Sequence, residues 1–587
     1  MGLNLHTSNR LETLLEGLVA VVQKPLPSVL QPEIVVVQSV GMGRWLSLQL
    51  AKQQRICANV QFPFPRKFLS EVFRAALPAT PESQDFDREV MTWRLMHLLP
   101  QLVERPEFQA VHSYVSGENP GLKRFQLSTR IADVFNQYLA FRPLMVLDWD
   151  RGQENHWQAL LWRELAKQSQ GLHQAELGRK LVETIKRDDG VLKQLPSRIS
   201  IFGVSTLPQF YLSLIEALGK RVEVHLFVME PTPQWWQDIV SPREEGRILG
   251  RQPNRTAEDL HLERGNTLLA SMGKLGRDFL GSLADLEFAV FHEHFVEPDS
   301  GKLLSSIQRD IFELRDPAPK APLAVNDRSV QVHSCHSEMR EVEVLHDQLL
   351  ALFAENATLQ PQDIVVMMPE VSSYAAFIEA VFDTPEMPKL RIPYSIADRS
   401  VRVENGIIDT FLTILELTGS RFGASSLLNI LESPAVQARF SLVHPDLETI
   451  RVWIDKAGIR WGIDSAHREK LGLPAFAQNT WQEGLDRLLL GYALPGGNSQ
   501  LFQDILPCDE IEGNLADTLG NFIEFTSRIF ETARELEAPR TLQQWQLTLR
   551  EVVDRFFDPT DDVERELLQV RRILESLGET GEIAGFA

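Results

Sequence analysis

The chain has 587 residues, of which 43% are hydrophobic and 24% are charged. This composition excludes collagen-like, low-complexity and largely disordered chains, and the length predicts about three to five structural units. The net charge of -21 excludes a protein that coats nucleic acid through a uniformly basic surface.

Charge is distributed unevenly along the chain. Residues 1–80 contain eight Lys and Arg against four acidic residues, whereas residues 501–587 contain eight Arg against nineteen acidic residues. A local basic groove is therefore compatible with the net charge, and we expect any polyanion to bind near the N-terminal end.

Cysteine usage and hydropathy predict a cytoplasmic protein. Cys57, Cys335 and Cys508 are far apart and match no disulfide framework or C-x-x-C metal pattern. The N-terminus lacks a basic region followed by an apolar stretch, and no run approaches the ~18 to 20 apolar residues that cross a bilayer. We expect no membrane partner.

Short β-branched runs, each followed by a turn and an amphipathic helix, predict buried parallel strands. The runs are residues 34–37, 199–202, 222–227, 330–333 and 364–368. From about 75 to 195 the apolar spacing is helical instead, notably at 89–104 and 122–141, and Pro143 is expected to end the second helix. Residues 1–75 and 196–325 are therefore expected to form one α/β domain, interrupted by a helical insertion at 76–195.

Residues 230–262 are rich in turn residues and charge, which predicts a long surface excursion. The prolines from Pro317 to Pro322 predict a linker. Residues 326–400 are then expected to begin a second α/β domain, with a helix at 338–353. The mostly helical pattern of residues 401–587 predicts a helical insertion of that domain, with truncation left open.

In phosphate-binding α/β proteins the loop after the first strand reads G-x-x-x-x-G-K-[ST]. We assign residues 38–45 (QSVGMGRW) to that position. Gln38 then replaces the first glycine, Arg44 the lysine and Trp45 the hydroxyl that binds Mg²⁺. Because an indole offers no oxygen ligand, we expect a degenerate ATP site and no cofactor or catalytic residue in this chain. The alternative is a strand–turn–helix corner whose glycines serve packing.

The same region offers an amide, an aromatic ring and several cations: Gln38, Arg44, Phe64 and the pair Arg66 and Lys67. Amides and guanidinium groups read base edges, and aromatic faces stack on unpaired bases. This set predicts a single-stranded DNA path. The alternative places the aromatic rings in the core and the basic pair on a solvated surface.

Two further groups leave alternatives open. His333, Cys335 and His336 are metal-ligand types, but no second cluster completes a tetrahedral set, so we expect no metal site. Trp235 and Trp236 are either an anchor for a partner or an intramolecular lid.

Seven ordered blocks resemble one family, the gamma subunits of exodeoxyribonuclease V, called RecC in the bacterial RecBCD helicase-nuclease. The blocks are residues 6–11 (HTSNRL), 37–39 (VQS) together with Gly41, Met42, Trp45 and Leu46, 125–128 (FQLS), 266–278 (NTLLASMGKLGRD), 340–346 (REVEVLH), 392–398 (IPYSIAD) and 458–464 (GIRWGID). The resemblance runs from one end of the chain to the other. Family members are considerably longer, so the chain resembles their N-terminal portion.

The resemblance implies two superfamily 1 helicase-like (RecA-like) parallel-sheet domains with helical insertions and no working ATP site. It implies RecB-like and RecD-like partners, which bind ATP and Mg²⁺ and supply the helicase and nuclease activities. The RecC-like subunit would hold them together on double-stranded DNA ends, guide the unwound single strands and recognise the Chi signal in recombinational repair. The alternatives from the residues are an autonomous ATP-dependent helicase that uses Arg44 as a phosphate clamp, and an interaction module with a vestigial channel.

Residues associated with Chi reading in this family match Gln38, Asp133 and Arg142 in type. At other channel positions, including Arg44, Phe64 and Asn136, this sequence departs from the enterobacterial pattern, so the recognised octamer is left open. The alternative for Asp133 and Arg142 is a surface ion pair. The predicted DNA-binding set is Gln38, Arg44, Phe64, Arg66, Lys67, Asp133, Asn136 and Arg142.

Overall fold

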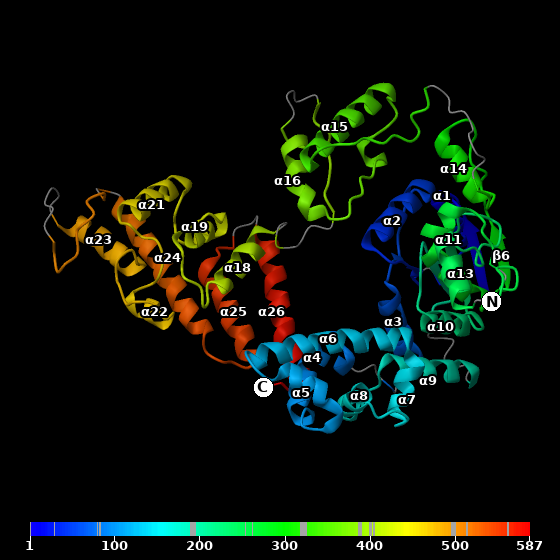
Figure 1. The fold of residues 1–587 in the computed structure, drawn as a ribbon, viewed down its shortest axis with the longest axis horizontal. Helices are drawn as coiled ribbons and strands as arrows, with labels where there is room; N and C mark the ends of the chain where they lie inside the picture. The colour runs from blue at the N-terminus through cyan, green and yellow to red at the C-terminus, as the bar shows by residue number, and fades with distance from the viewer. Residues whose placement is uncertain are drawn as a thin grey trace. The chain divides into compact units, whose positions relative to one another are not determined.

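The computed structural model divides the chain into two compact units, residues 1–332 and 333–587 (Figure 1). Each unit is described by itself. The residues described are 2–28, 30–78, 80, 84–187, 195–252, 254–260, 262–316, 326–384, 390–397, 402, 405–494, 501–511, 513, 515–559 and 563–586. The predicted linker at Pro317 to Pro322 lies outside them.

The first unit is built on one parallel sheet of six strands in the order β3-β2-β4-β5-β1-β6. The strands are β1 (Gly2–Ser8), β2 (Glu33–Val36), β3 (Val60–Gln61), β4 (Arg198–Phe202), β5 (Glu223–Met229) and β6 (Val290–Glu293). The predicted strands at 34–37, 199–202 and 222–227 are confirmed as β2, β4 and β5. The sequence analysis missed β1, which lies between β5 and β6.

Helices cover both faces of this sheet, as alternation of side chains along the strands requires. Leu14 and Leu18 of α1 (Leu11–Val22) and Leu46 of α2 (Val40–Gln54) pack with Val35 and Phe227 on one face. The other face is covered by α3 (Pro65–Ala76), α9 (Gln174–Arg187), α10 (Gln209–Gly219) and α13 (Lys274–Ala284).

A helical segment separates β3 from β4 in the chain, as predicted. Its remaining helices are α4 (Arg88–Leu102), α5 (Gln109–Val115), α6 (Pro120–Phe141), α7 (Pro143–Asp150) and α8 (Trp157–Lys167), with short 3-10 turns at Gln84–Phe86 and Pro106–Phe108. The predicted helices at 89–104 and 122–141 are confirmed as α4 and α6. Pro143 begins α7, which fits its role as a helix-starting residue. These helices share their own core around Phe135 and Trp162.

The predicted surface excursion at 230–262 is partly helical. It contains α11 (Pro242–Arg251), none of whose side chains is buried, and is followed by α12 (Thr267–Met272) and, after β6, by α14 (Leu303–Phe312). Trp235 is 52% exposed but Trp236 is 3% exposed. Trp236 packs with Leu269 and against Gly276, so the intramolecular alternative is correct for this ring.

The second unit begins with α15 (Glu338–Glu355), a 3-10 turn (Pro361–Asp363) and α16 (Val371–Phe382), which confirms the predicted helix at 338–353. The strands predicted at 330–333 and 364–368 are wrong as assigned, because neither run forms a ladder with any described segment. A strand is stabilised by a neighbouring backbone, which an apolar run alone does not supply. Ile364 still packs against α15 and α16, whereas Val365 is 79% exposed.

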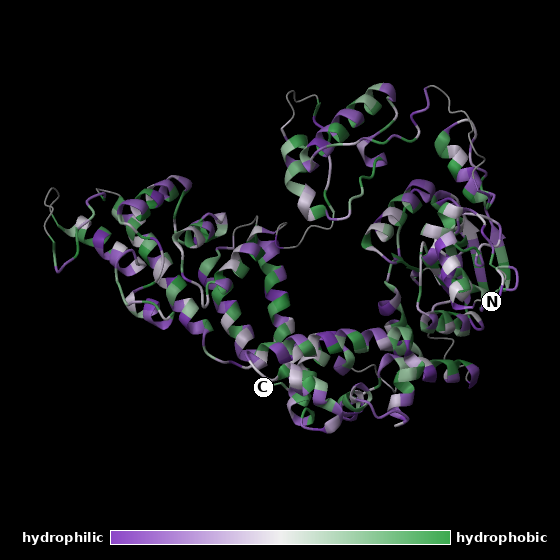
Figure 2. Ribbon diagram, viewed as in Figure 1, coloured by the Kyte–Doolittle hydropathy of each residue, from purple (hydrophilic) through white to green (hydrophobic). Residues whose placement is uncertain are grey.

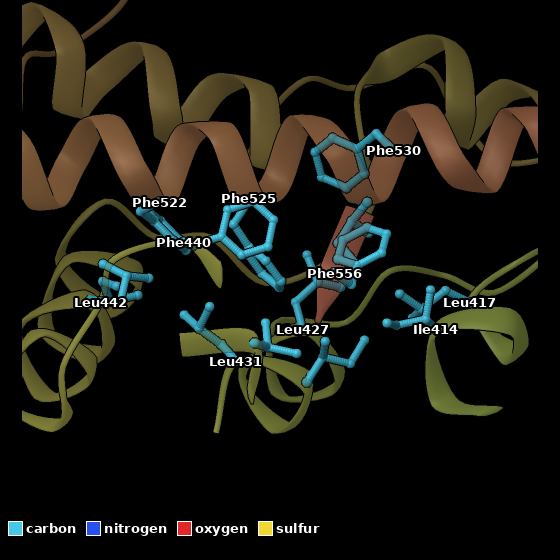
Figure 3. Close-up of a cluster of buried hydrophobic side chains, with 14 of the residues drawn as sticks. Ile414, Leu417, Leu427, Leu431, Phe440, Leu442, Phe522, Phe525, Phe530 and Phe556 are labelled. Carbon is cyan, nitrogen blue, oxygen red and sulfur yellow. The ribbon is translucent and has the colours of Figure 1, made fainter. Parts of the chain in front are cut away.

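The rest of the second unit is helical, as predicted. The helices are α18 (Gly406–Glu416), α19 (Ala424–Leu431), α20 (Pro434–Arg439), α21 (His444–Lys456), α22 (Ser465–Lys470), α23 (Trp481–Ala493), α24 (Leu515–Leu536), α25 (Leu542–Phe556) and α26 (Glu564–Ala584). Phe440, Phe525 and Phe556 meet in their shared core, as Figure 3 shows. Hydrophobic and hydrophilic residues alternate along these helices (Figure 2), which is the pattern of one buried face. Among the described helices, none is long and apolar enough to cross a membrane.

Candidate nucleic-acid interface

The loop that follows the first strand is the connection Asn9–Arg10, so our assignment of residues 38–45 to that position is wrong. The Asn9 side chain donates to the Val296 carbonyl at 2.8 Å and accepts from the Val296 amide at 3.0 Å. Ser8 Oγ donates to the His294 carbonyl at 2.7 Å. This connection has neither glycine nor lysine, and its polar side chains are held by residues 294–296. Arg10 is a cation, but its amide donates to Ser8 Oγ at 3.0 Å. A phosphate-binding loop instead presents several free backbone amides and a lysine.

Carboxyl groups lie beside this connection. The Glu230 amide donates to the Ser8 carbonyl at 2.9 Å, and Glu293 lies opposite Thr7 in the β1–β6 register. Burial, and then repulsion from Glu293, raise the pKa of Glu230 to about 7. Two interacting acidic residues therefore lie next to the end of β1.

The raised pKa of Glu230 predicts a pH-dependent effect of Glu230→Gln. In the unfolded chain this carboxyl titrates near pH 4.5, so above that value folding opposes ionisation, and the native state loses stability as pH rises towards 7. We expect the substitution to stabilise the protein by about 2 kcal/mol at pH 8 and to have little effect at pH 4.5. Thermal melts at both pH values measure this, with exposed Glu258→Gln as the control. Equal effects at both pH values would contradict the prediction.

Residues 38–45 instead form the corner between β2 and α2, in agreement with the alternative of a packing corner. The helix begins at Val40, and the Ser39 side chain accepts from the Met42 amide at 3.1 Å. A Cβ on Gly43 would lie 3.2 Å from Phe62 Cβ, so this glycine allows close packing. Arg44 is exposed on α2.

Gln38 is exposed, but both ends of its amide are engaged. Nε2 donates to the Thr206 carbonyl at 2.6 Å, and Oε1 accepts from the Ser205 amide at 3.3 Å. Gln38 thus joins the carboxyl ends of β2 and β4. To contact a base, its amide would have to exchange these partners.

Arg66 connects three helices. It lies in the first turn of α3, where it donates to the Asp87 carboxylate before α4 at 2.8 Å and to the side-chain oxygen Oδ1 of Asn136 on α6 at 3.4 Å. Phe64 is the N-cap residue of α3 and is 42% exposed. Lys67 follows Arg66 and is exposed. The predicted pair Arg66 and Lys67 therefore lies beside the predicted Asn136.

Asp133 lies one turn before Asn136 on α6 and forms an ion pair with Arg88 of α4. Asp133 thus forms an ion pair, but with Arg88 and not with Arg142, and this contact leaves a role in DNA binding open. Partial burial raises the pKa of Asp87 and outweighs the opposing effect of Arg66. We call Arg66, Asp87, Arg88, Asp133 and Asn136 the α3–α4–α6 junction.

Arg142 follows the last residue of α6, and its guanidinium lies 5.8 Å from the centre of the Tyr138 ring. Its neighbour Phe141 is 67% exposed. The sequence analysis missed Phe141 because it counted this ring as part of the apolar helical pattern. A signal was available, since Phe141 is adjacent to Arg142, and aromatic rings and arginines both contribute to binding of unpaired bases.

Four cations of this region lack an acidic partner among the residues that the structure describes: Arg44, Lys67, Arg130 and Arg142. Lys67, Arg130 and Arg142 belong to α3 and α6 or their ends, which Arg66 joins through Asn136. Unpaired, solvated cations are the groups that neutralise phosphates on binding. The structure brings together Arg66, Lys67, Asp133 and Asn136, whereas Gln38 and Arg44 belong to the β2–α2 corner.

The fold and this surface define an α/β protein with a six-stranded parallel sheet, a helical insertion and a polar, partly cationic helical junction. The family model described as "RecC, N-terminal domain" matches residues 3–314, and the model "RecBCD enzyme subunit RecC fourth domain" matches residues 404–587. The chain belongs to the RecC family.

Curated relatives support the same assignment. The RecBCD enzyme subunit RecC of Escherichia coli K12 is 36% identical over 98% of this chain and 56% of the relative. The Haemophilus influenzae subunit is 32% identical over 98% of the chain and 56% of the relative, and the Mycolicibacterium smegmatis subunit is 30% identical over 100% and 54%. The chain spans about half the length of these relatives.

Proposed function

We propose that this chain is the non-catalytic scaffold and DNA-channel part of a RecBCD-type helicase-nuclease that acts in double-strand-break repair in the cytoplasm. In this role it holds RecB-like and RecD-like subunits together, guides the unwound strands and recognises Chi. The observation that carries the proposal is the first strand–helix connection of a RecC-family chain: Asn9–Arg10 has no lysine or glycine, and Asn9 is tied to Val296.

We propose that the domains follow the helicase pattern with a degenerate ATP site. Residues 1–75 and 196–325 form the first helicase-like (RecA-like) domain, with the insertion at 76–195. Residues 326–400 form the first part of a second such domain, and residues 401–587 its helical insertion. The shared core of α15 and α16, against which Ile364 packs, supports one folded body for the described part of residues 338–392.

Single-stranded DNA is proposed to run across the α3–α4–α6 junction. Lys67 and Arg142 neutralise phosphates, because neither has an acidic partner among the described residues. Phe64 and Phe141 offer exposed rings for base stacking.

The polar residues of the junction are proposed to read bases. Arg66, Asp133 and Asn136 are held in place by their mutual contacts and by Asp87 and Arg88. Such fixed donors and acceptors discriminate between bases more sharply than mobile ones. Gln38 and Arg44 would contact the strand at the β2–α2 corner.

An ATPase assay separates this proposal from the autonomous helicase. The purified chain is expected to show no turnover of Mg²⁺-ATP, with or without single-stranded DNA, because the Asn9–Arg10 connection lacks the glycines and the lysine of a phosphate-binding loop. A preparation of Arg44→Ala, which removes the cation of the rival mechanism, serves as the matched control. Turnover by the wild type that Arg44→Ala abolishes would establish the helicase and contradict the proposal.

A further inference from the structure

Three histidines from two neighbouring strands converge at the edge of the sheet. His6 of β1 lies opposite His292 in the parallel β1–β6 register, and His294 follows two residues later. The ladder continues to that position, because the His294 amide donates to the Thr7 carbonyl at 2.9 Å. Side chains two residues apart share one face of a strand, so all three imidazoles lie on the same face.

The ligand atoms of these three histidines are close enough to share one ion. The nitrogen atoms lie within 4.8 Å of one another. A tetrahedral zinc ion with bonds of ~2.0–2.1 Å holds its nitrogen ligands about 3.4 Å apart. The His6 and His292 ring centres are 4.4 Å apart. The rings are stacked, with 13° between the planes of His6 and His292 and 3° between those of His292 and His294. Binding of one ion therefore requires the half-buried rings of His292 and His294 to rotate.

The surroundings of His6 suit a metal ligand. Its Nδ1 is buried and has no hydrogen-bond partner among the described residues, and its Nε2 lies 3.1 Å from His225 Nδ1. The Nε2 of His225 in turn lies 3.1 Å from a Glu223 oxygen. A carboxylate–histidine chain of this kind orients imidazole ligands behind a metal ion.

We propose that His6, His292 and His294 form a binding site for one divalent cation of the zinc class. Neutral imidazoles favour zinc and its neighbours in the transition series over Mg²⁺ or Ca²⁺, which prefer oxygen ligands. The ion connects the edge strand β6 to the interior strand β1. It thereby stabilises the part of the sheet that carries residues 294–296, the partners of the Asn9–Arg10 connection.

The site differs from the one weighed in the sequence analysis. His333, Cys335 and His336 supply ligand types in sequence, but the described residues include no three-ligand cluster there. His333 and His336 are exposed. The double variant His333→Ala/His336→Ala therefore removes two accessible histidines without touching the proposed site, and it serves as a matched control.

Zinc binding to the purified, chelator-treated chain is measured by competition with a chromophoric chelator. We expect one Zn²⁺ per chain, bound tightly enough to compete with the chelator. His292→Ala/His294→Ala should weaken binding at least 100-fold, whereas the control variant should bind like the wild type. Circular dichroism checks that each variant is folded, and the single variant His294→Asn should lose about tenfold.

Cobalt absorption gives a second readout that depends on coordination itself. Co²⁺ added to the wild type should give the intense visible bands of a low-coordinate site, and these bands should be missing from the His292→Ala/His294→Ala chain. Equal Zn²⁺ affinity of the wild type and this variant would overturn the proposal. Loss of the ion from the His333→Ala/His336→Ala control would do so too, because it would place the ligands elsewhere.

Discussion

Replacing Arg198 by methionine is expected to destabilise the first unit by about 3–5 kcal/mol. Arg198 of β4 and Glu33 of β2 are 4% and 6% exposed, and Arg198 Nε donates to Glu33 Oε1 at 2.9 Å. Arg198 Nη2 also donates to the Lys24 carbonyl at 3.0 Å. Removing the guanidinium leaves the Glu33 carboxylate buried without a counter-charge, which costs far more than the lost packing.

The double variant Glu33→Leu/Arg198→Met tests the reason for this loss. Because it removes both charges, it should recover most of the stability that Arg198→Met loses. Urea unfolding, with hydrogen exchange of the β2 and β4 amides as a local probe, measures both variants. A loss below about 1 kcal/mol for Arg198→Met would show that water reaches the carboxylate. A double variant as unstable as the single one would assign the loss to packing.

Gly491→Ala is expected to destabilise the second unit by at least about 2 kcal/mol, although alanine is the better helix former. A Cβ at this position of α23 would lie 1.9 Å from the Cys508 carbonyl oxygen and 2.4 Å from its carbon. The Cys508 segment cannot retreat easily, because its amide donates to the Arg487 carbonyl at 2.8 Å and Arg487 Nε donates to the Leu506 carbonyl at 2.9 Å. Backbone atoms cannot rotate away as a side chain can. The steric overlap is therefore removed only by a shift of the chain, which costs stability.

Gly520→Ala is the matched control for that substitution. Gly520 lies within α24, is exposed, and a Cβ there would meet no atom within 4 Å. Helix propensity then acts alone, and the variant should be more stable than the wild type by about 0.5–1 kcal/mol. Thermal unfolding of both variants should therefore shift in opposite directions. Shifts of the same sign would show that the Cys508 segment moves aside.

The elements that the sequence predicted well are those whose own side chains carry the signal. The helices at 89–104 and 122–141 repeat apolar residues at helical spacing, and the strands at 199–202 and 222–227 are rich in β-branched and aromatic residues. Strands β4 and β5 each have a neighbouring strand on both sides, so the burial of their side chains agrees with the residue pattern that predicted them.

Strand β1 was missed because half of its side chains are polar. Asn4, His6 and Ser8 lie on one face, and their polar groups find partners only in the fold: Asn4 donates to the Val224 carbonyl and Ser8 to the His294 carbonyl. These partners lie far away in the sequence, so no local pattern predicts them. Missing β1 also shifted the expected phosphate loop from Asn9–Arg10 to residues 38–45.

The strand predictions at 330–333 and 364–368 failed for the opposite reason. Their residue types favour strands, but Val332 is 92% exposed and Val365 is 79% exposed, and no described backbone pairs with either run. The residue types of a segment show that it can form a strand. It becomes one only where a neighbouring backbone pairs with it.

The candidate interface could be predicted as a set of residue types but not as an arrangement. The contact of Arg66 with Asn136 joins positions 70 residues apart, and the partners Asp87 and Arg88 carried no signal of their own in the sequence. The exposure of the Phe141 ring likewise could not be predicted from the sequence, because it depends on how α6 packs in the fold.

Single-stranded DNA binding to the α3–α4–α6 junction tests the central claim most directly. Fluorescence anisotropy of a labelled oligothymidine compares the wild type with Lys67→Ala/Arg142→Ala over a range of salt concentrations. The control is Arg243→Ala/Arg247→Ala, which removes the same charge from exposed positions of α11 in the same unit.

The account predicts that Lys67→Ala/Arg142→Ala weakens binding about tenfold or more at low salt. The slope of log affinity against log salt should fall by about 1.4, because two phosphate contacts are lost at ~0.7 each. The α11 control should match the wild type in both respects. Unchanged affinity and slope in Lys67→Ala/Arg142→Ala, or an equal loss in the α11 control, would contradict a DNA path along these helices.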